Sequence, residues 1–255
     1  MELQLEVVND WALAMLLLSI RLAPLVAFAP PLSLLNLPLR VRVLLTLSLA
    51  ACLVPVSGIP QAPVDSGTGH FLVLAAGELV LGVGIAFALQ AAFASLYFAG
   101  RLLDIQSGFG LATVLDPATR APTPLIGSFF AFGAAAVFFA ADGHHELLRV
   151  LAATLQVVPV GAVSQGWTAE QLIAQAGLVF SLGLATAAAG VVVLFLTDVA
   201  LGFMSRTLPQ MNILVLGLQV KSVVLVLTLV LMTGLLAPAF LRATESGLRF
   251  IGGLS

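Results

Sequence analysis

Single charged residues interrupt the long apolar runs of this sequence, and they restrict its possible folds more than any other feature. Arg21, Glu78, Asp198 and Lys221 each lie within or beside such a run. On insertion scales, an Arg, Lys or Asp at the centre of a lipid-exposed helix costs about 2.5–3.5 kcal/mol. Each of these side chains therefore needs a partner, a water-filled cavity or a contact with another subunit.

The composition indicates what surrounds the chain. Of its 255 residues, 60% are hydrophobic and 9% are charged, and the mean hydropathy is +1.14. Lipid, or an equally apolar protein surface, must surround most of the chain, because ordinary domains are only about 45–50% apolar. The net charge of −2 gives no basic footprint for nucleic acid, and one cysteine allows no disulfide framework. The acidic N-terminus is unlike a secretory signal, so the first apolar stretch is expected to be retained.

The apolar pattern predicts an all-α chain whose helices are separated by breaks rich in proline and glycine. A loop is expected from Pro55 to Gly69, and a polar stretch containing Gly and Pro from Arg101 to Pro124. A turn is expected at residues 209–212, and a short mixed tail from Arg242 to Ser255. The expected helices cover residues 11–28, 36–54, 70–100, 125–141, 144–159, 172–207 and 213–241.

Two features argue against a simple bundle of lipid-spanning helices. A hydrocarbon core needs about 20 helical residues, but the helix that follows the capping box at Thr168–Gln171 can continue to Arg206. Small residues also recur at every fourth position, which lets helix backbones approach closely. These stripes are Gly177, Ser181, Ala185 and Ala189, and Gly127, Ala131 and Ala135.

Catalytic and metal-binding signatures are weak. The segment from Asp142 to Glu146 contains two adjacent histidines, but neighbours on a helix point about 100° apart and rarely share one ion. We therefore interpret it as a helix-start turn. Asp104 and Asp116 flank a Gly-Phe-Gly segment, but Leu111 stands where an intramembrane aspartyl protease signature needs aspartate. We expect no enzyme activity, no catalytic residues, no cofactor and no metal.

The buried charges allow two interpretations. Together they suit the proton or ion relay of a secondary transporter. They equally suit structural charges buried at contacts between subunits. The absence of a visible transporter-type repeat favours the second interpretation. The residues concerned are Glu78, Asp104, Asp198, Arg206 and Lys221.

Two motifs carry a more specific likeness. Residues 99–110 read AGRLLDIQSGFG and continue to Leu115-Asp116-Pro117, and residues 206–212 read RTLPQMN with Lys221 downstream. Gly77-Glu78, Gly82, Gly84 and the segment Gly143–His145 occur in the matching order. Over essentially its whole length, the chain resembles the FliR/SctT/SpaR family of type III export-gate proteins.

The resemblance implies an architecture and partners. Residues 1–167 would form a FliP-like helical region, and residues 168–255 a FliQ-like helical hairpin with a C-terminal tail. The chain would join FliP-like and FliQ-like subunits, with an FlhB-like protein nearby, in the bacterial inner membrane at the flagellar basal body. This assembly would contact membrane lipid and export unfolded flagellar proteins. A virulence injectisome is the alternative setting, and an ion-coupled transporter is a more distant one.

The resemblance also implies roles for particular residues. The loop at residues 105–123, with Gly108, Phe109 and Gly110, would be the plug that fills the closed pore. Arg206, Pro209 and Gln210 would form a turn that faces the pore or a neighbouring subunit. Glu78, Asp104, Asp198 and Lys221 would be charges buried between subunits.

Overall fold

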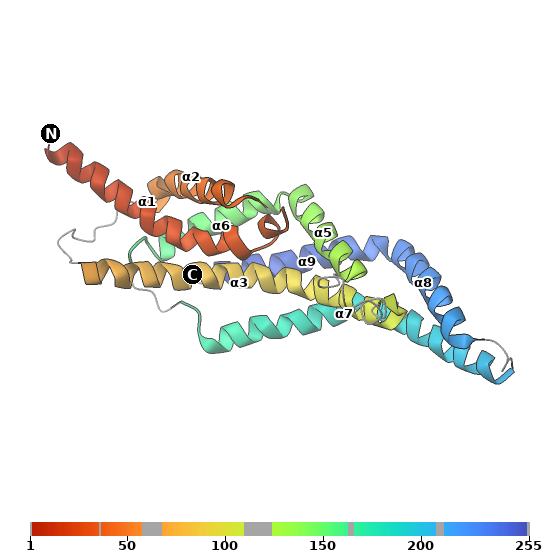
Figure 1. The fold of residues 1–255 in the computed structure, drawn as a ribbon. Helices are drawn as coiled ribbons and strands as arrows, with labels where there is room; N and C mark the ends of the chain where they lie inside the picture. The colour runs from red at the N-terminus through yellow and green to blue at the C-terminus, as the bar shows by residue number, and fades with distance from the viewer. Residues whose placement is uncertain are drawn as a thin grey trace. The chain divides into compact units, whose positions relative to one another are not determined.

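The computed structural model in Figure 1 describes residues 2–35, 37–57, 68–109, 124–162, 166–207 and 212–253. Within these ranges the regular structure is entirely helical, which confirms the all-α prediction. The elements are α1 (Glu2–Phe28), the 3₁₀ helix η1 (Leu32–Leu35), α2 (Leu39–Ser57), α3 (Thr68–Ser107), α5 (Leu125–Ala140), α6 (Gly143–Val157), α7 (Ala169–Thr207), α8 (Ile213–Leu231) and α9 (Thr233–Gly252).

The helices are long and apolar enough for a membrane. Among the described residues, four candidate spans occur: Val8–Phe28, Leu39–Val56, Gly69–Ser107 and Ala169–Thr207. Two further helix pairs, α5 with α6 and α8 with α9, meet the same test as broken spans, so the described residues contain up to six candidate spans. Together with the apolar composition, these helices define an all-α membrane protein.

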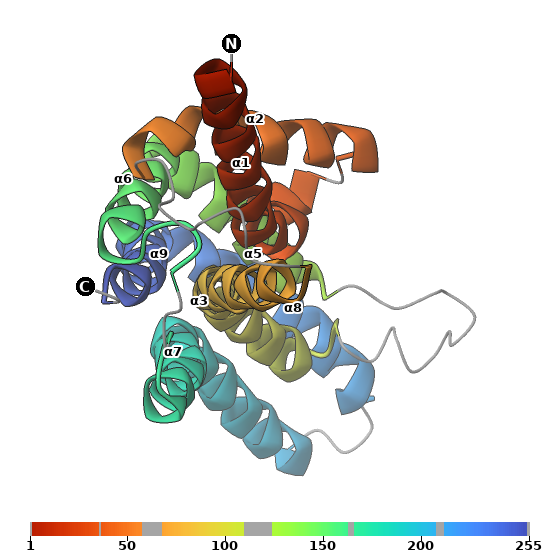
Figure 2. The same cartoon turned by 90° about the vertical axis from the view of Figure 1, so that its left-hand side faces the viewer.

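The chain divides into two compact units, and α3, α5, α7 and α9 each contribute residues to both. The first unit contains residues 1–91, 139–175 and 244–255. In it α1 and α6 lie beside the N-terminal part of α3, as Figure 2 shows in a view along that helix, and α2 packs on α1 and α6. Its core includes Leu18, Leu22, Ile85, Leu89 and Leu155, all almost fully buried. The predicted division of the chain at residue 168 stays a prediction.

The end of the chain is fixed in the first unit by aromatic packing. The indole of Trp167 stacks on the ring of Phe250, with ring centroids 5.4 Å apart. Its Nε1–H also donates to the Phe250 carbonyl oxygen at 3.2 Å. A Cβ atom at position 84 would lie 2.0 Å from this indole, so only glycine leaves room for it on α3. The segment 242–252, expected to be a tail, therefore belongs to α9 and ends packed against Trp167.

The second unit contains residues 92–138 and 176–243. Its core includes Leu96, Leu103, Phe130, Phe138, Leu194 and Leu225. Close approaches of helix backbones occur at glycines, as the stripe containing Gly127 predicted: a Cβ at Gly100 would lie 2.5 Å from the Gly127 Cα. On α7 the packed small residues are Gly183, Ala187 and Gly190 instead of the predicted stripe. The stripe from Gly177 to Ala189 is exposed in this chain.

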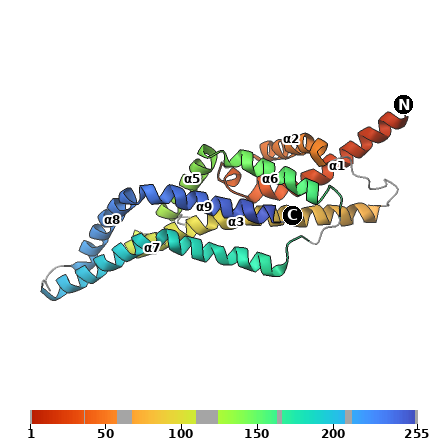
Figure 3. The same ribbon diagram turned by 180° about the vertical axis from the view of Figure 1, so that it is seen from behind.

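Several predicted boundaries were wrong. The first helix was expected from Trp11, but α1 begins at Glu2, because no proline or glycine precedes Trp11 to interrupt it. The stretch after Arg101, expected to be irregular, continues α3 to Ser107, because the polar residues on that turn find partners in the fold. The helix expected at residues 213–241 breaks at Met232, where α8 and α9 meet at a bend of 72°, visible in Figure 3. Pro238 lies in the second turn of α9, where it removes a backbone donor and clashes with the preceding turn, which disfavours a continuous helix.

Candidate functional site

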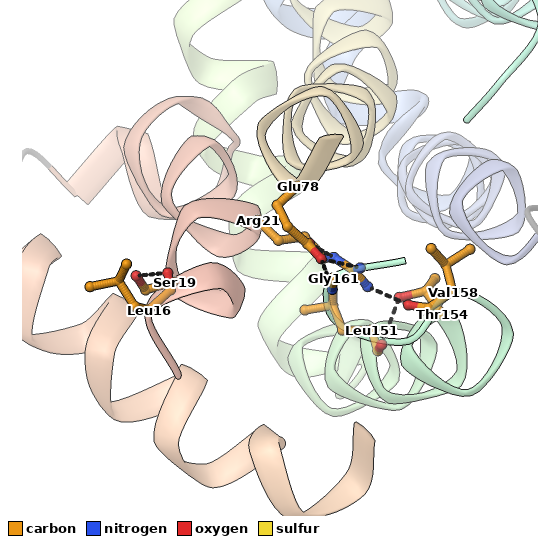
Figure 4. A network of polar contacts seen from close by, with 8 residues as sticks. All are labelled: Leu16, Ser19, Arg21, Glu78, Leu151, Thr154, Val158 and Gly161. Atoms are coloured by element: carbon orange, nitrogen blue, oxygen red, sulfur yellow. Dashed lines mark hydrogen bonds and ion pairs between the residues drawn. The ribbon is translucent and has the colours of Figure 1, made fainter. Parts of the chain in front are cut away.

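In the described part of the chain, three polar anchors join α1, α3, α5, α7 and α8, and each is centred on a charge that the sequence marks as costly. The first, in the first unit, joins α1, α3 and the segment after α6 (Figure 4). Arg21 Nε donates to Glu78 Oε2 at 2.5 Å, and Arg21 Nη2 donates to Glu78 Oε1 at 3.0 Å. This bidentate geometry is the strong form of an ion pair, because two parallel charge-assisted bonds fix the plane of both groups.

Backbone groups complete the first anchor. Arg21 Nη1 donates to the Val158 carbonyl oxygen at 3.0 Å, and the Gly161 N–H donates to Glu78 Oε1 at 2.8 Å. Gly161 has φ of +79°, a conformation that suits glycine and turns its N–H toward the carboxylate. Both charged side chains are almost fully buried. The anchor therefore fixes the segment that follows α6 against α1 and α3.

A close helix contact supports the same anchor. A Cβ atom at position 82 would lie 2.1 Å from the Arg21 carbonyl oxygen, so α3 touches the backbone of α1 one turn beyond Glu78. Any side chain at Gly82 would separate the two helices and pull Glu78 away from Arg21. Arg21 was not among the predicted site residues. The available signal was its position as a lone cation in one apolar run, while Glu78 is a lone anion in another.

The second anchor, in the second unit, is Asp104 at the N-terminus of α5. Its carboxylate accepts hydrogen bonds from the Ile126 N–H at 3.0 and 3.1 Å and from the Gly127 N–H at 3.1 Å. The first N–H groups of a helix have no partner within the helix, and an anion there is also favoured by the helix dipole. Asp104 is only 1% exposed, so these bonds are made in an apolar setting.

Asp104 joins the chain on both sides of the predicted plug loop. It lies one turn before the end of α3, and its partners open α5. Gly108, with φ of +90°, ends the helix, and a Cβ there would lie 2.3 Å from Leu218 Cδ2. Phe109 is half-buried. Gly110 and the rest of the loop to residue 123 lie outside the described residues, so the plug stays a prediction.

The third anchor, also in the second unit, is Lys221 on α8. Its ammonium forms an ion pair with Asp198 on α7 and donates to the Gln106 carbonyl oxygen on α3 at 3.3 Å. Gln106 Nε2 in turn donates to the Val191 carbonyl oxygen at 3.1 Å. The side chain of Lys221 is 18% exposed and that of Asp198 is 43% exposed. The three helices are thus joined by one partly solvated network.

The remaining predicted residues are not brought together. Arg206 is exposed near the end of α7. Pro209 and Gln210 lie outside the described residues, so their role in a turn facing the pore stays a prediction. Glu78, Asp104, Asp198 and Lys221 all find partners within the chain. Other subunits are therefore not needed to satisfy them, and additional contacts of these four with other subunits stay a prediction.

Replacing Lys221 by methionine is expected to destabilise the chain by about 1–2 kcal/mol. This value lies between those of exposed ion pairs, about 0–1 kcal/mol, and of broken buried pairs, about 3–5 kcal/mol. We place it low in that range because Asp198 keeps solvent access. The measurement is a double-mutant cycle with Asp198→Asn, read from thermal unfolding midpoints in detergent. Lys221→Arg keeps the charge and is the matched control, and zero coupling between the two positions would contradict the assignment.

Comparisons with known proteins place this all-α membrane protein in a family. The model of the family described as bacterial export proteins, family 1, matches residues 12–247. The chain belongs to that family.

Individual relatives come from both flagellar and other secretion systems. The flagellar biosynthetic protein FliR of Bacillus subtilis (strain 168) is 31% identical over 82% of this chain and 81% of its own length. FliR of Escherichia coli (strain K12) is 29% identical over 86% and 84%. The secretion system apparatus protein SsaT of Salmonella typhimurium is 27% identical over 88% of each chain. The chain is accordingly a subunit of a type III export gate, embedded with other components in a membrane apparatus.

Proposed function

We propose that this chain forms, with FliP-like and FliQ-like subunits, the pore through which unfolded flagellar proteins leave across the bacterial inner membrane. An FlhB-like protein is the expected neighbour at the entrance. The chain would supply structure and a seal, without catalysis, because the polar side chains described above are engaged in joining helices. The flagellar setting is preferred to an injectisome because flagellar relatives match at up to 31% identity.

The length and exposure of α7 carry this proposal. With 39 residues, the helix is about 58 Å long at 1.5 Å per residue, almost twice the roughly 30 Å hydrocarbon core. In its most apolar stretch of 18 residues, only 22% of the residues are buried within the chain. Lipid alone cannot cover an apolar helix of that length. Other apolar protein surfaces must cover the remainder, and subunits stacked beside it would do so.

Large apolar side chains on other helices support the same conclusion. Leu231 is 85% exposed, Leu39 is 76% exposed and Ile173 is 71% exposed. The span in α2 is only 17% buried. In an isolated chain, the part of this surface inside the membrane would contact lipid, and the part outside the membrane would be exposed to water. Exposed apolar area of this extent marks an interaction site.

The isolated chain is expected to be degraded quickly and to be rescued by co-expression of its partners. The physical reason is the uncovered apolar surface, since the three anchors are satisfied without other subunits. The measurement is a chase of tagged chain in cells, with and without FliP-like and FliQ-like proteins, followed by co-purification. A long-lived monomer in both conditions would contradict the gate assignment and favour the transporter alternative, which substrate-coupled flux in purified protein would then test.

Separate experiments test whether the setting is a flagellum or an injectisome, and whether the chain is without catalytic activity. Deleting the gene should abolish swimming and the secretion of flagellar subunits if the setting is flagellar. Loss of effector secretion with normal swimming would assign the chain to an injectisome. Hydrolase activity of the purified gate that disappears when Asp104 and Asp116 are replaced would overturn the non-catalytic role.

A further inference from the structure

We propose that Asp142, His144 and His145 form a binding site for a divalent transition-metal ion of the zinc and copper class. The three residues lie at the start of α6, in the first unit. One ligand atom from each residue can be chosen so that all three lie within 4.8 Å of one another. This site is independent of the three anchors and of the export function.

The adjacent histidines come together in spite of their positions on the helix. Consecutive residues of a helix point about 100° apart, which argued against a shared ion. In the structure, the rings of His144 and His145 nevertheless have centroids only 4.1 Å apart and planes inclined by 37°. The side-chain torsions therefore bring the two imidazoles to one place, and the objection from helix geometry does not hold here.

Asp142 reaches the same place because of its backbone conformation. Its φ of 56° and ψ of 24° are left-handed, and its side chain makes no capping hydrogen bond to α6. Its carboxylate instead approaches His145, with Oδ1 3.3 Å from Nδ1. A residue at this position usually caps the helix, and the carboxylate is released from that role and faces the imidazoles.

The spacing suits a small tetrahedral ion after a modest contraction. Zinc binds imidazole nitrogen and carboxylate oxygen at about 2.0–2.2 Å, so its tetrahedral ligands lie roughly 3.3–3.6 Å apart. The side chains of Asp142 and His145 are 76% and 61% exposed and are free to close the remaining distance. Two imidazoles, one carboxylate and a water in the fourth position match the ligand set of open zinc sites.

A second observation concerns His144. Within the described part of the chain, its Nδ1 is buried and has no hydrogen-bond partner. A buried polar atom without a partner calls for an explanation, and a bound ion is one of those that native proteins offer. The positive end of the α6 dipole opposes a cation, but the Asp142 carboxylate provides compensating negative charge, whereas the nearby Glu146 is already paired with Arg149.

The ligand chemistry also selects among metals. Imidazole ligands favour zinc, nickel and copper. The affinity of such a site rises from Co²⁺ through Ni²⁺ to Cu²⁺, and Zn²⁺ binds less tightly than Cu²⁺. Magnesium and calcium require oxygen ligands and should not compete. Once bound, the ion would join the residue before α6 to its first turn and would raise the unfolding midpoint by mass action.

The test is calorimetric titration of ZnCl₂ into the full chain, purified with its partner subunits in detergent through a tag without histidine. We expect binding that His145→Ala, His144→Gln and Asp142→Asn each weaken by more than about 10-fold, because even the loss of an outer-shell partner costs 10–100-fold. His145 is the most informative position, since its exposed ring can be removed without disturbing the core.

Two matched controls use the other candidate ligands of this chain. His70 is the remaining histidine and Cys52 the single cysteine, and both are exposed. His70→Ala and Cys52→Ser should titrate like the unchanged protein, and excess Mg²⁺ should leave the zinc isotherm unchanged. The proposal is overturned if zinc heats do not exceed buffer dilution, or if all three ligand variants bind as tightly as the unchanged protein.

Discussion

Replacing Glu78 by alanine is expected to destabilise the chain by about 3–5 kcal/mol, the cost of leaving one partner of a buried ion pair without its counter-charge. Arg21 would remain 2% exposed in an apolar setting, with only the Val158 carbonyl oxygen as a described partner. The Gly161 N–H would lose its acceptor at the same time. Because the free energy of unfolding of a typical domain is only about 5–15 kcal/mol, the variant gate should fail to accumulate at growth temperature.

The measurement is the unfolding midpoint of purified gate in detergent, together with export in cells. The double variant Arg21→Met with Glu78→Leu separates a buried charge from a lost contact. It should recover part of the stability, since apolar residues of similar volume often replace a buried pair at little cost. The two hydrogen bonds between these charged groups and the backbone of Val158 and Gly161, about 1.5–3 kcal/mol each, would remain lost.

A control for this cycle is the exposed pair of Glu245 and Arg249, whose side chains are 55% and 82% exposed. Glu245→Ala should change stability by less than about 1 kcal/mol. If Glu78→Ala is as mild as Glu245→Ala, the Arg21–Glu78 pair does not hold the first unit together. If the double variant is less stable than Glu78→Ala, the lost contacts of the pair cost more stability than the unmatched charge of Arg21 does.

The sequence predicted that charges needed partners but not which partners they would find. Arg21 and Glu78 are 57 positions apart, and apolar runs give no register between two helices. Several other partners are backbone groups, such as those of Val158, Gly161 and Ile126, and no residue type in the sequence predicts them. Composition therefore predicts the helices well, while the anchors depend on tertiary contacts that only the structure reveals.

Helix ends show the same division between local and tertiary signals. The break after Phe28 was predicted from Pro30 and Pro31, because proline acts through its own backbone. The extension of α3 to Ser107 was missed because Asp104 looked like a loop residue until its partners at α5 were known. The separation of α8 from α9 was missed because the apolar pattern runs through Met232 without interruption.

The last expected result concerns the seal of the pore. Replacing Asp104 by alanine removes the acceptor for the first N–H groups of α5 and frees one side of the segment 110–123. Hydrogen bonds to a charged group contribute about 1.5–3 kcal/mol each, so a loss of about 3 kcal/mol is expected. If the segment is the plug, the closed gate should also begin to leak small ions, because a seal works only while its ends are held.

Conductance across bilayers that carry the purified gate measures this leak. Asp104→Asn, which keeps one acceptor oxygen but no charge, should give a smaller effect. Phe109→Ala removes the bulky group beside the hinge glycine at 108, and replacing residues 111–121 by glycine and serine at equal length removes the bulk of the loop. Both should leak while Asp104 still holds α5 in place. If the closed conductance of these loop variants equals that of the unchanged gate, the segment does not seal the pore. Asp104 would then act only as the cap of α5.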